Sequence, residues 1–302
     1  MRVFRDVFQD SSLISRIIRF TIHKQKAVCT KGVRQIKKLP IKTIYYNDEQ
    51  NDEFSRAQIT PKKITKDYEY IFKNPLKILG SFIAYRLIAT PIAFFYSKIR
   101  LGQRVRNRRV LRFVNKKQGF FLFANHTQDI GDAFMPHIAI FPKRAYTVVH
   151  PNNVSMPILG RINPALGALP IPSEIRGLRP FSNAIRNRIK GGFAVVIYPE
   201  AHIWPYYIGI RDFPDTAMKY PVELGAPSFT MTNTYKKRKI GLRPRVITYI
   251  DGPFYPDTSL PKREQVRELR EQIYKKMRER SLESNCEFIR YVKNEDKNNK
   301  EN

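Results

Sequence analysis

Apolar residues gather in short runs, separated by polar and turn-forming residues, over the C-terminal two thirds of the chain. The clearest run, at 120–124, lies between Gly119 and Asn125, a pattern typical of a strand buried on both faces. Further strand signals lie at 145–149, 193–198, 228–234 and 246–250, and helical signals lie at 182–189, at 218–224 and after 259. This alternation predicts a three-layer α/β domain.

The segment 74–99 is the most apolar part of the chain and is long enough to cross a bilayer. Lys77 and Arg86 interrupt it, however, and Pro91 would kink a helix. A charge near the bilayer centre costs at least ~2.5–3.5 kcal/mol. We therefore expect a helix, or a bent helix pair, embedded in one leaflet, with the arginines of 100–112 among anionic headgroups. A buried core helix is the alternative interpretation.

The two ends of the chain are polar. Residues 1–45 are basic, with apolar residues at helical spacing between 13 and 22, which predicts a helix on an anionic membrane or on its own domain. The acidic stretch 47–53 is interpreted as a linker. The predicted organisation is a basic helical N-terminal region with this linker (1–73), an α/β domain that includes the apolar helix 74–99 (74–293), and a disordered tail (294–302).

The charge balance indicates an anionic partner. The chain has 55 Lys and Arg against 26 Asp and Glu, a net charge of +29. Nucleic acid, acidic phospholipid and a phosphorylated substrate or carrier would all suit this charge. No nucleic acid is expected, because there is no zinc-finger or RNP-like motif and the long apolar helix would serve no purpose. The two cysteines, Cys29 and Cys286, form no metal-binding spacing and indicate a reducing compartment.

Polar residues follow the predicted strand 120–124 directly. His126 comes second after the strand, and Asp129 and Asp132 lie three and six residues further on. Ligands of open α/β sheets bind beyond the carboxyl ends of the strands. A histidine held there by a carboxylate can act as a general base, although a lone histidine is more often structural.

Two classes of hydrolase are alternatives to this interpretation. A metal-dependent hydrolase could use His126, Asp129 and Asp132 with Glu200 and His202, but no pair among them has a recognised ligand spacing. A serine hydrolase is disfavoured, because the chain has no Gly-x-Ser-x-Gly motif.

The stretch 125–132 (NHTQDIGD) resembles the first signature block of the glycerolipid acyltransferases, a family that includes the lysophosphatidate acyltransferases. That block is Asn-His, four residues and Asp. Here Gly131 stands at the Asp position. We take Asp132 as the equivalent with one residue inserted, and Asp129 remains an alternative.

Three later segments resemble the other blocks of the family. In 156–172 Gly167 fits the second block, but the arginine that the family uses for the acceptor phosphate falls on Ser173, and the nearest basic residue is Arg176. The third block is matched by Tyr198-Pro199-Glu200, followed by Ala201, His202 and Ile203 in place of Gly, Thr and Arg. Residues 224–227 match the fourth. Together the blocks extend over about residues 75–260.

The resemblance implies a membrane-associated O-acyltransferase with a central mixed sheet and an N-terminal membrane anchor. The implied donor is acyl-CoA or acyl-carrier protein, and the acceptor is a (lyso)phospholipid or related hydroxyl at the cytoplasmic face. His126 would be the base, paired with Asp132 or Asp129, without metal or cofactor. The residues expected to bind substrate are Asn125, Gly167, Ser173, Arg176, Glu200, His202 and Arg211. The missing arginines predict little preference for glycerol 3-phosphate-type acceptors, unless Arg176, Arg179 or Arg211 replaces them.

Overall fold

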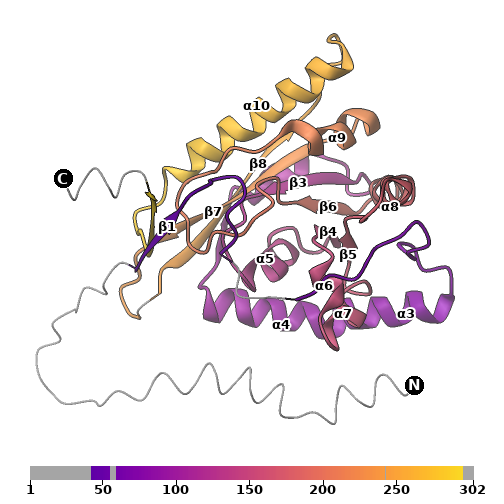
Figure 1. Ribbon diagram of the computed structural model, residues 1–302, viewed down its shortest axis with the longest axis horizontal. Helices are drawn as coiled ribbons and strands as arrows, with labels where there is room; N and C mark the ends of the chain where they lie inside the picture. Colours follow the sequence, from indigo (N-terminus) through magenta and orange to yellow (C-terminus); the bar gives the residue numbers. More distant parts are fainter. Residues whose placement is uncertain (1–41, 55–58, 242, 295–302) are drawn as a thin grey trace, which may run out of the picture. The chain divides into compact units, whose positions relative to one another are not determined.

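The computed structural model describes residues 42–54, 59–241 and 243–294 (Figure 1). In this part of the chain a seven-stranded sheet is the central element, with strand order β2-β8-β7-β3-β6-β4-β5. The strands are β2 (Arg104–Arg106), β3 (Phe120–Ala124), β4 (Ala145–Val149), β5 (Ala168–Pro170), β6 (Ala194–Ile197), β7 (Ser228–Lys236) and β8 (Arg245–Phe254). Only β7 and β8 pair antiparallel among these described strands, so the sheet is mixed, as predicted.

Strand β3 lies in the middle of the sheet, and all five of its residues are buried. Its side chains alternate between the two faces, as strand geometry requires. Because β3, β6, β4 and β5 are parallel, the loops that follow them lie at one edge of the sheet. This is the edge at which the sequence places the candidate site.

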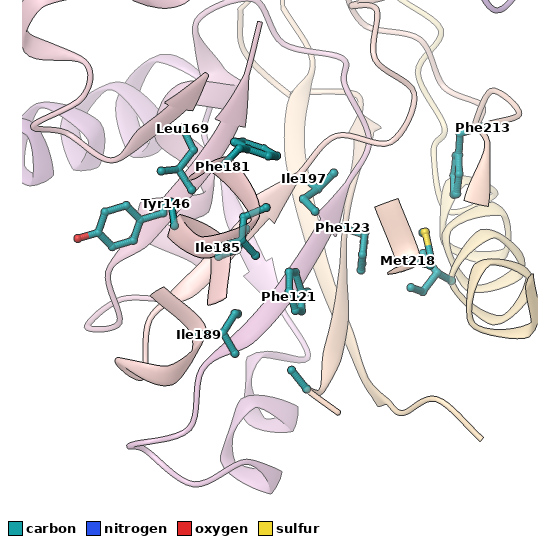
Figure 2. Close-up of a cluster of buried hydrophobic side chains, with 14 of the residues drawn as sticks. Phe121, Phe123, Tyr146, Leu169, Phe181, Ile185, Ile189, Ile197, Phe213 and Met218 are labelled. Atoms are coloured by element: carbon teal, nitrogen blue, oxygen red, sulfur yellow. The ribbon is translucent and has the colours of Figure 1, made fainter. Parts of the chain in front are cut away.

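Helices cover both faces of the sheet. On one face Phe121 and Phe123 of β3 pack with side chains from α8 (Leu178–Lys190), α9 (Lys219–Leu224) and α10 (Lys262–Ser281). Figure 2 shows part of this cluster, with Phe121 and Phe123 beside Ile185 and Ile197. On the other face Phe120 and Leu122 pack with the end of α5 (Gly131–Ala139). Shorter helices are η3 (Arg108–Phe113), α6 (Asn152–Ser155), α7 (Leu159–Ile162), η4 (Ile175–Gly177) and η5 (Asp215–Met218).

The apolar segment forms one uninterrupted helical run at 75–100, made of α3 (Pro75–Ile83), η1 (Ala84–Ala89), α4 (Thr90–Phe95) and η2 (Tyr96–Arg100). Pro91 does not end this helix. It lies in the first turn of α4, just after a π-helical turn in which the Thr90 N–H donates to the Tyr85 carbonyl. A residue without an N–H is tolerated at such a position.

The helix 75–100 has one buried side and one exposed side. Tyr85 is 2% exposed, and its hydroxyl lies 2.6 Å from His137 Nδ1 and accepts the Ala145 N–H at 2.9 Å. Burial lowers the pKa of His137 to about 4, so the ring is neutral at pH 7. Only 17% of the most apolar window of this helix is buried, so the alternative of a buried core helix is wrong.

The structure differs from the predicted organisation near the N-terminus. β1 (Lys42–Tyr46) pairs in parallel with β9 (Ile289–Lys293), two strands that the apolar pattern did not predict. The acidic stretch is no linker, because the Asp52 carbonyl accepts a hydrogen bond from Trp204 Nε1 at 2.8 Å. The described residues from 42 to 294 belong to one compact unit. The predicted helix at 13–22 and tail positions 295–302 lie outside the described residues.

Candidate active site

His126 lies in the loop between β3 and α5, and Asp132 lies in the first turn of α5. His126 Nδ1 and Asp132 Oδ2 are 2.8 Å apart, and the same oxygen accepts the Gln128 N–H at 2.9 Å. The side chain of Asp132 is 2% exposed, whereas that of His126 is 24% exposed. A buried carboxylate therefore orients an imidazole ring that solvent or a substrate can reach.

The residue at 131 explains why the partner of His126 is Asp132, one residue after the Asp position of the signature block. A Cβ atom at Gly131 would lie 2.8 Å from the Gln128 Cβ and 2.9 Å from the Leu101 Cδ1, so an aspartate does not fit there. Asp129 is exposed. The pairing deduced from a one-residue insertion is thus the one that the structure contains.

The electrostatics of the pair fix the tautomer of the histidine. Burial raises the pKa of Asp132, while the hydrogen bonds from His126 and the Gln128 N–H oppose that rise. With the carboxylate as acceptor, the proton of the neutral ring sits on Nδ1, which leaves Nε2 as the basic nitrogen. This is the arrangement that a general base requires.

Tyr198, at the end of β6, completes the support of His126. Its ring stacks on the imidazole, with 4.6 Å between centroids, and its hydroxyl donates to the Asp132 carbonyl at 2.7 Å. Burial raises the pKa of Tyr198 well above its usual value, so the hydroxyl stays a donor. In the sequence Tyr198 is recognisable as the first residue of the Tyr-Pro-Glu block, but nothing in that block indicates that it contacts His126.

Asn125, predicted to bind substrate, ties the His126 loop to the neighbouring strand. Its amide Nδ2 donates to the Asn233 carbonyl at 3.0 Å, and its Oδ1 accepts the Asn233 N–H at 2.8 Å. Further along the loop the Tyr235 hydroxyl donates to Thr127 Oγ1 at 2.8 Å. Both contacts come from β7, which therefore holds the backbone on either side of His126.

Glu200 follows β6 and forms a buried ion pair with Arg211, with 3.1 Å between Glu200 Oε2 and the guanidinium. Arg211 also donates to the His202 and Glu49 carbonyls, and its side chain is 1% exposed. Burial raises the pKa of Glu200 to about 7, although Arg211 and His126 oppose that rise. The Arg211 guanidinium, predicted to bind substrate, is enclosed and hydrogen-bonded to protein groups in this structure.

His202 lies at the surface rather than with His126. Its Nδ1 is 3.1 Å from Glu53 Oε2, and both side chains are more than a third exposed. In the part of the chain that the structure describes, no three His, Cys, Asp or Glu side chains are grouped as metal ligands. The metal-dependent hydrolase therefore has no ligand set among these residues.

Of the predicted residues of the second block, Gly167 lies just before β5, whereas Ser173 and Arg176 follow it. Gly167 has φ +102°, and a Cβ atom there would lie 2.7 Å from the Ala145 carbonyl, so this glycine allows close strand packing. Ser173 Oγ accepts the Ile64 N–H at 3.0 Å. Arg176, in η4, is exposed. Ser173 and Arg176 lie at the same edge of the sheet as His126, but β5 is three strands away from β3.

No protein-family model matches the sequence, and no curated protein matches it. A solved structure does resemble it: the crystal structure of the 1-acyl-sn-glycerophosphate (LPA) acyltransferase PlsC from Thermotoga maritima. The TM-score is 0.50 over 72% of this chain and 91% of that one, at 16% sequence identity. The fold is similar to that of PlsC. At this identity the likeness concerns the fold, and the function of this chain must be argued from its own site.

Proposed function

We propose that the protein is a membrane-associated O-acyltransferase, which moves a fatty acyl group from a thioester to the hydroxyl of a (lyso)phospholipid or related lipid. The observation that carries this proposal is the pair of His126 and buried Asp132 at the carboxyl end of β3. The PlsC-like fold supports it. Acyl-CoA and acyl-carrier protein are the proposed donors, which places the reaction at the cytoplasmic face of the membrane.

In the proposed reaction His126 Nε2 takes the proton of the acceptor hydroxyl as its oxygen attacks the thioester carbonyl carbon. Asp132 stabilises the imidazolium that forms. The carbon–sulfur bond then breaks, and the thiolate takes the proton back from Nε2, so that the products are an ester and a free thiol. The residues present supply both proton transfers without an acyl-enzyme.

Glu200 is proposed to bind the acceptor. Its Oε2 is engaged by Arg211, but Oε1 is buried and has no hydrogen-bond partner among the described residues. A buried carboxylate oxygen without a partner is costly, and a substrate hydroxyl would satisfy it. Because the Glu200 side chain is 0% exposed, this contact requires the residues that cover it to move when the acceptor binds.

The exposed side of helix 75–100 is the proposed membrane-binding surface. Leu76, Leu87 and Ile99 are each at least 68% exposed. Arg86 does not oppose this assignment, because it lies over the Phe141 ring and donates to the Pro142 carbonyl. A helix with one face on the protein and one apolar face outward suits embedding in one leaflet.

Replacing Leu76, Leu87 and Ile99 together with glutamine should weaken binding to anionic vesicles at least tenfold, because each apolar side chain gains roughly 1.5–3 kcal/mol on burial. Vesicle co-sedimentation in high salt measures this. Leu282→Gln is the matched control, since Leu282 is 84% exposed but lies after α10. Unchanged, salt-resistant binding by the triple variant would contradict the assignment.

Asp132→Asn is expected to lower kcat by a large part of the factor that His126 supplies, because an amide can hold the ring in the wrong tautomer. The loss should not add to that of His126→Ala. Asp129→Asn is the matched control and should leave kcat nearly unchanged. Steady-state acyl transfer by the purified variants measures all three, and a larger loss in Asp129→Asn than in Asp132→Asn would show that the wrong carboxylate has been assigned.

A further inference from the structure

A cavity of about 430 Å³ lies at the same edge of the sheet as His126, beyond the ends of β4 and β5. Its lining includes Lys62, Lys63, His150 and Ser173, with prolines and Ile171 as the apolar part. His150 follows β4 directly, and Ser173 follows β5 by three residues. None of the lining residues is acidic. The lining therefore combines apolar side chains with two cationic ones.

The segment that carries the two lysines is held in place by backbone hydrogen bonds to Ser155 and Ser173. The Lys62 N–H donates to Ser155 Oγ at 2.7 Å, and the Ile64 N–H donates to Ser173 Oγ at 3.0 Å. The Ser173 N–H in turn donates to the Ile64 carbonyl at 3.0 Å. These bonds use the backbone and leave both ammonium groups exposed, and neither lysine is ion-paired with any described residue.

Position 173 is the one at which the family resemblance leads us to expect an arginine. Here a serine stands there and binds the segment that carries the lysines. Positive charge is thus present at this edge, but it comes from residues more than a hundred positions earlier in the chain. Nothing in the spacing of the signature blocks could have indicated this replacement.

The distance from His126 decides which substrate group the cavity suits. In the sheet β4 is two strands and β5 three strands from β3, which at ~4.8 Å per strand separates the cavity from the His126 loop by about 10–15 Å across the sheet. The few bonds between a glycerol hydroxyl and its own phosphate are too short to reach that far. The long amide-linked pantetheine arm between a thioester and its phosphate does reach.

We propose that this cavity binds the phosphate end of the acyl donor's pantetheine arm, with Lys62 and Lys63 as its cationic ligands. The proposal rests on the proposed acyltransferase function and names a donor site for it. It fits a group common to CoA and acyl-carrier protein. His150 also lines the cavity, and its Nδ1 accepts the Asn152 N–H at 3.3 Å.

Binding of CoA and of pantetheine, which lacks the phosphates, tests the proposal without turnover. In titration calorimetry the double variant Lys62→Gln, Lys63→Gln is expected to bind CoA about tenfold more weakly than the wild type, because two charge-assisted contacts are lost. Its affinity for pantetheine should not change. Lys66→Gln, on the same segment but outside the cavity lining, is the matched control, and Lys62→Arg with Lys63→Arg should keep the affinity for CoA.

Turnover provides the second readout. The double variant should raise KM for acyl-CoA and leave kcat and the KM for acyl-pantetheine unchanged. Equal weakening of CoA and pantetheine, or no weakening of either, would overturn the proposal. A loss that depends on whether the acceptor carries a phosphate would also overturn it, because the cavity would then bind the acceptor.

The binding assay separates this proposal from the proposed function. Lysine-dependent CoA binding by a wild-type protein that transfers no acyl group would leave the cavity assignment standing and remove the acyltransferase. Acyl transfer by a protein whose CoA binding does not depend on the lysines would leave the acyltransferase standing and remove the cavity assignment.

Discussion

Replacing His126 with alanine is expected to lower kcat for acyl transfer by about 10²–10⁴-fold, the usual contribution of a general base. The fold should survive, because the ring is partly exposed and its neighbours are held by other contacts: Asp132 by the Gln128 N–H and the loop backbone by β7. Steady-state kinetics of the purified variant measure the loss, and its melting temperature checks the fold.

His202→Ala is the matched control for this experiment. His202 also follows a strand of the site edge, but it lies at the surface against Glu53. Its removal should leave kcat close to that of the wild type. If His126→Ala and His202→Ala transfer acyl groups equally fast, His126 is not the base.

Replacing Arg211 with methionine is expected to destabilise the protein by about 3–5 kcal/mol at pH 8, because it leaves the Glu200 carboxylate buried without its partner. Denaturant unfolding at fixed pH measures this loss. Arg290→Met is the control: its partner Glu287 belongs to an exposed pair, and little change is expected. A change in Arg211→Met as small as that of the control would contradict the buried pair.

The loss in Arg211→Met should depend on pH. Burial raises the pKa of Glu200 to about 7, above the ordinary 4.5, so the fold favours the protonated carboxyl. That contribution to the free energy of unfolding is full below about pH 4.5 and is lost as pH rises through 7. Without Arg211 the pKa rises further, so the variant should lose less stability at pH 5 than at pH 8. Adding Glu200→Gln should remove this pH dependence.

The sequence was sufficient for the centre of the sheet and for placing His126 near a carboxylate beyond that strand. Five consecutive apolar residues can be buried on both faces only in a central strand, and β3 is that strand. His126 and Asp132 were identified because residues directly after such a strand must emerge at its carboxyl end. The spacing could not decide between Asp129 and Asp132, because it does not show which of the two carboxylates is buried against His126 Nδ1.

Long-range pairing is what the sequence did not reveal. β1 and β9 pair across almost the whole chain, and each is short and only partly buried, so neither shows a clear apolar pattern. The acidic stretch between β1 and Glu53 was interpreted as a linker because charge usually indicates solvent. In the structure its backbone carbonyls bind Trp204 and Arg211, and a sequence does not show where backbone groups are used.

The sequence also does not distinguish Arg176, which is exposed, from Arg211, which is enclosed. Arg176 and Arg211 were both candidates for a phosphate ligand, and only the first is exposed. What distinguishes them is a partner eleven residues away, Glu200, and the stacking of the Arg211 guanidinium on Trp204 at 4.9 Å. The sequence does not indicate Tyr198 for a related reason: its ring stacks on His126, and the two residues follow neighbouring strands that are far apart in the sequence.

The most direct test of the central claim is the fate of the acyl group. Purified wild-type protein is incubated with an anionic lipid extract and a thioester labelled in its acyl chain, either acyl-CoA or acyl-carrier protein. We expect the label to appear in a lipid ester in an amount equal to the thiol released, with none attached to the protein. Label recovered as free fatty acid, in amounts that match the thiol, would mean that water is the acceptor and would contradict the acyltransferase.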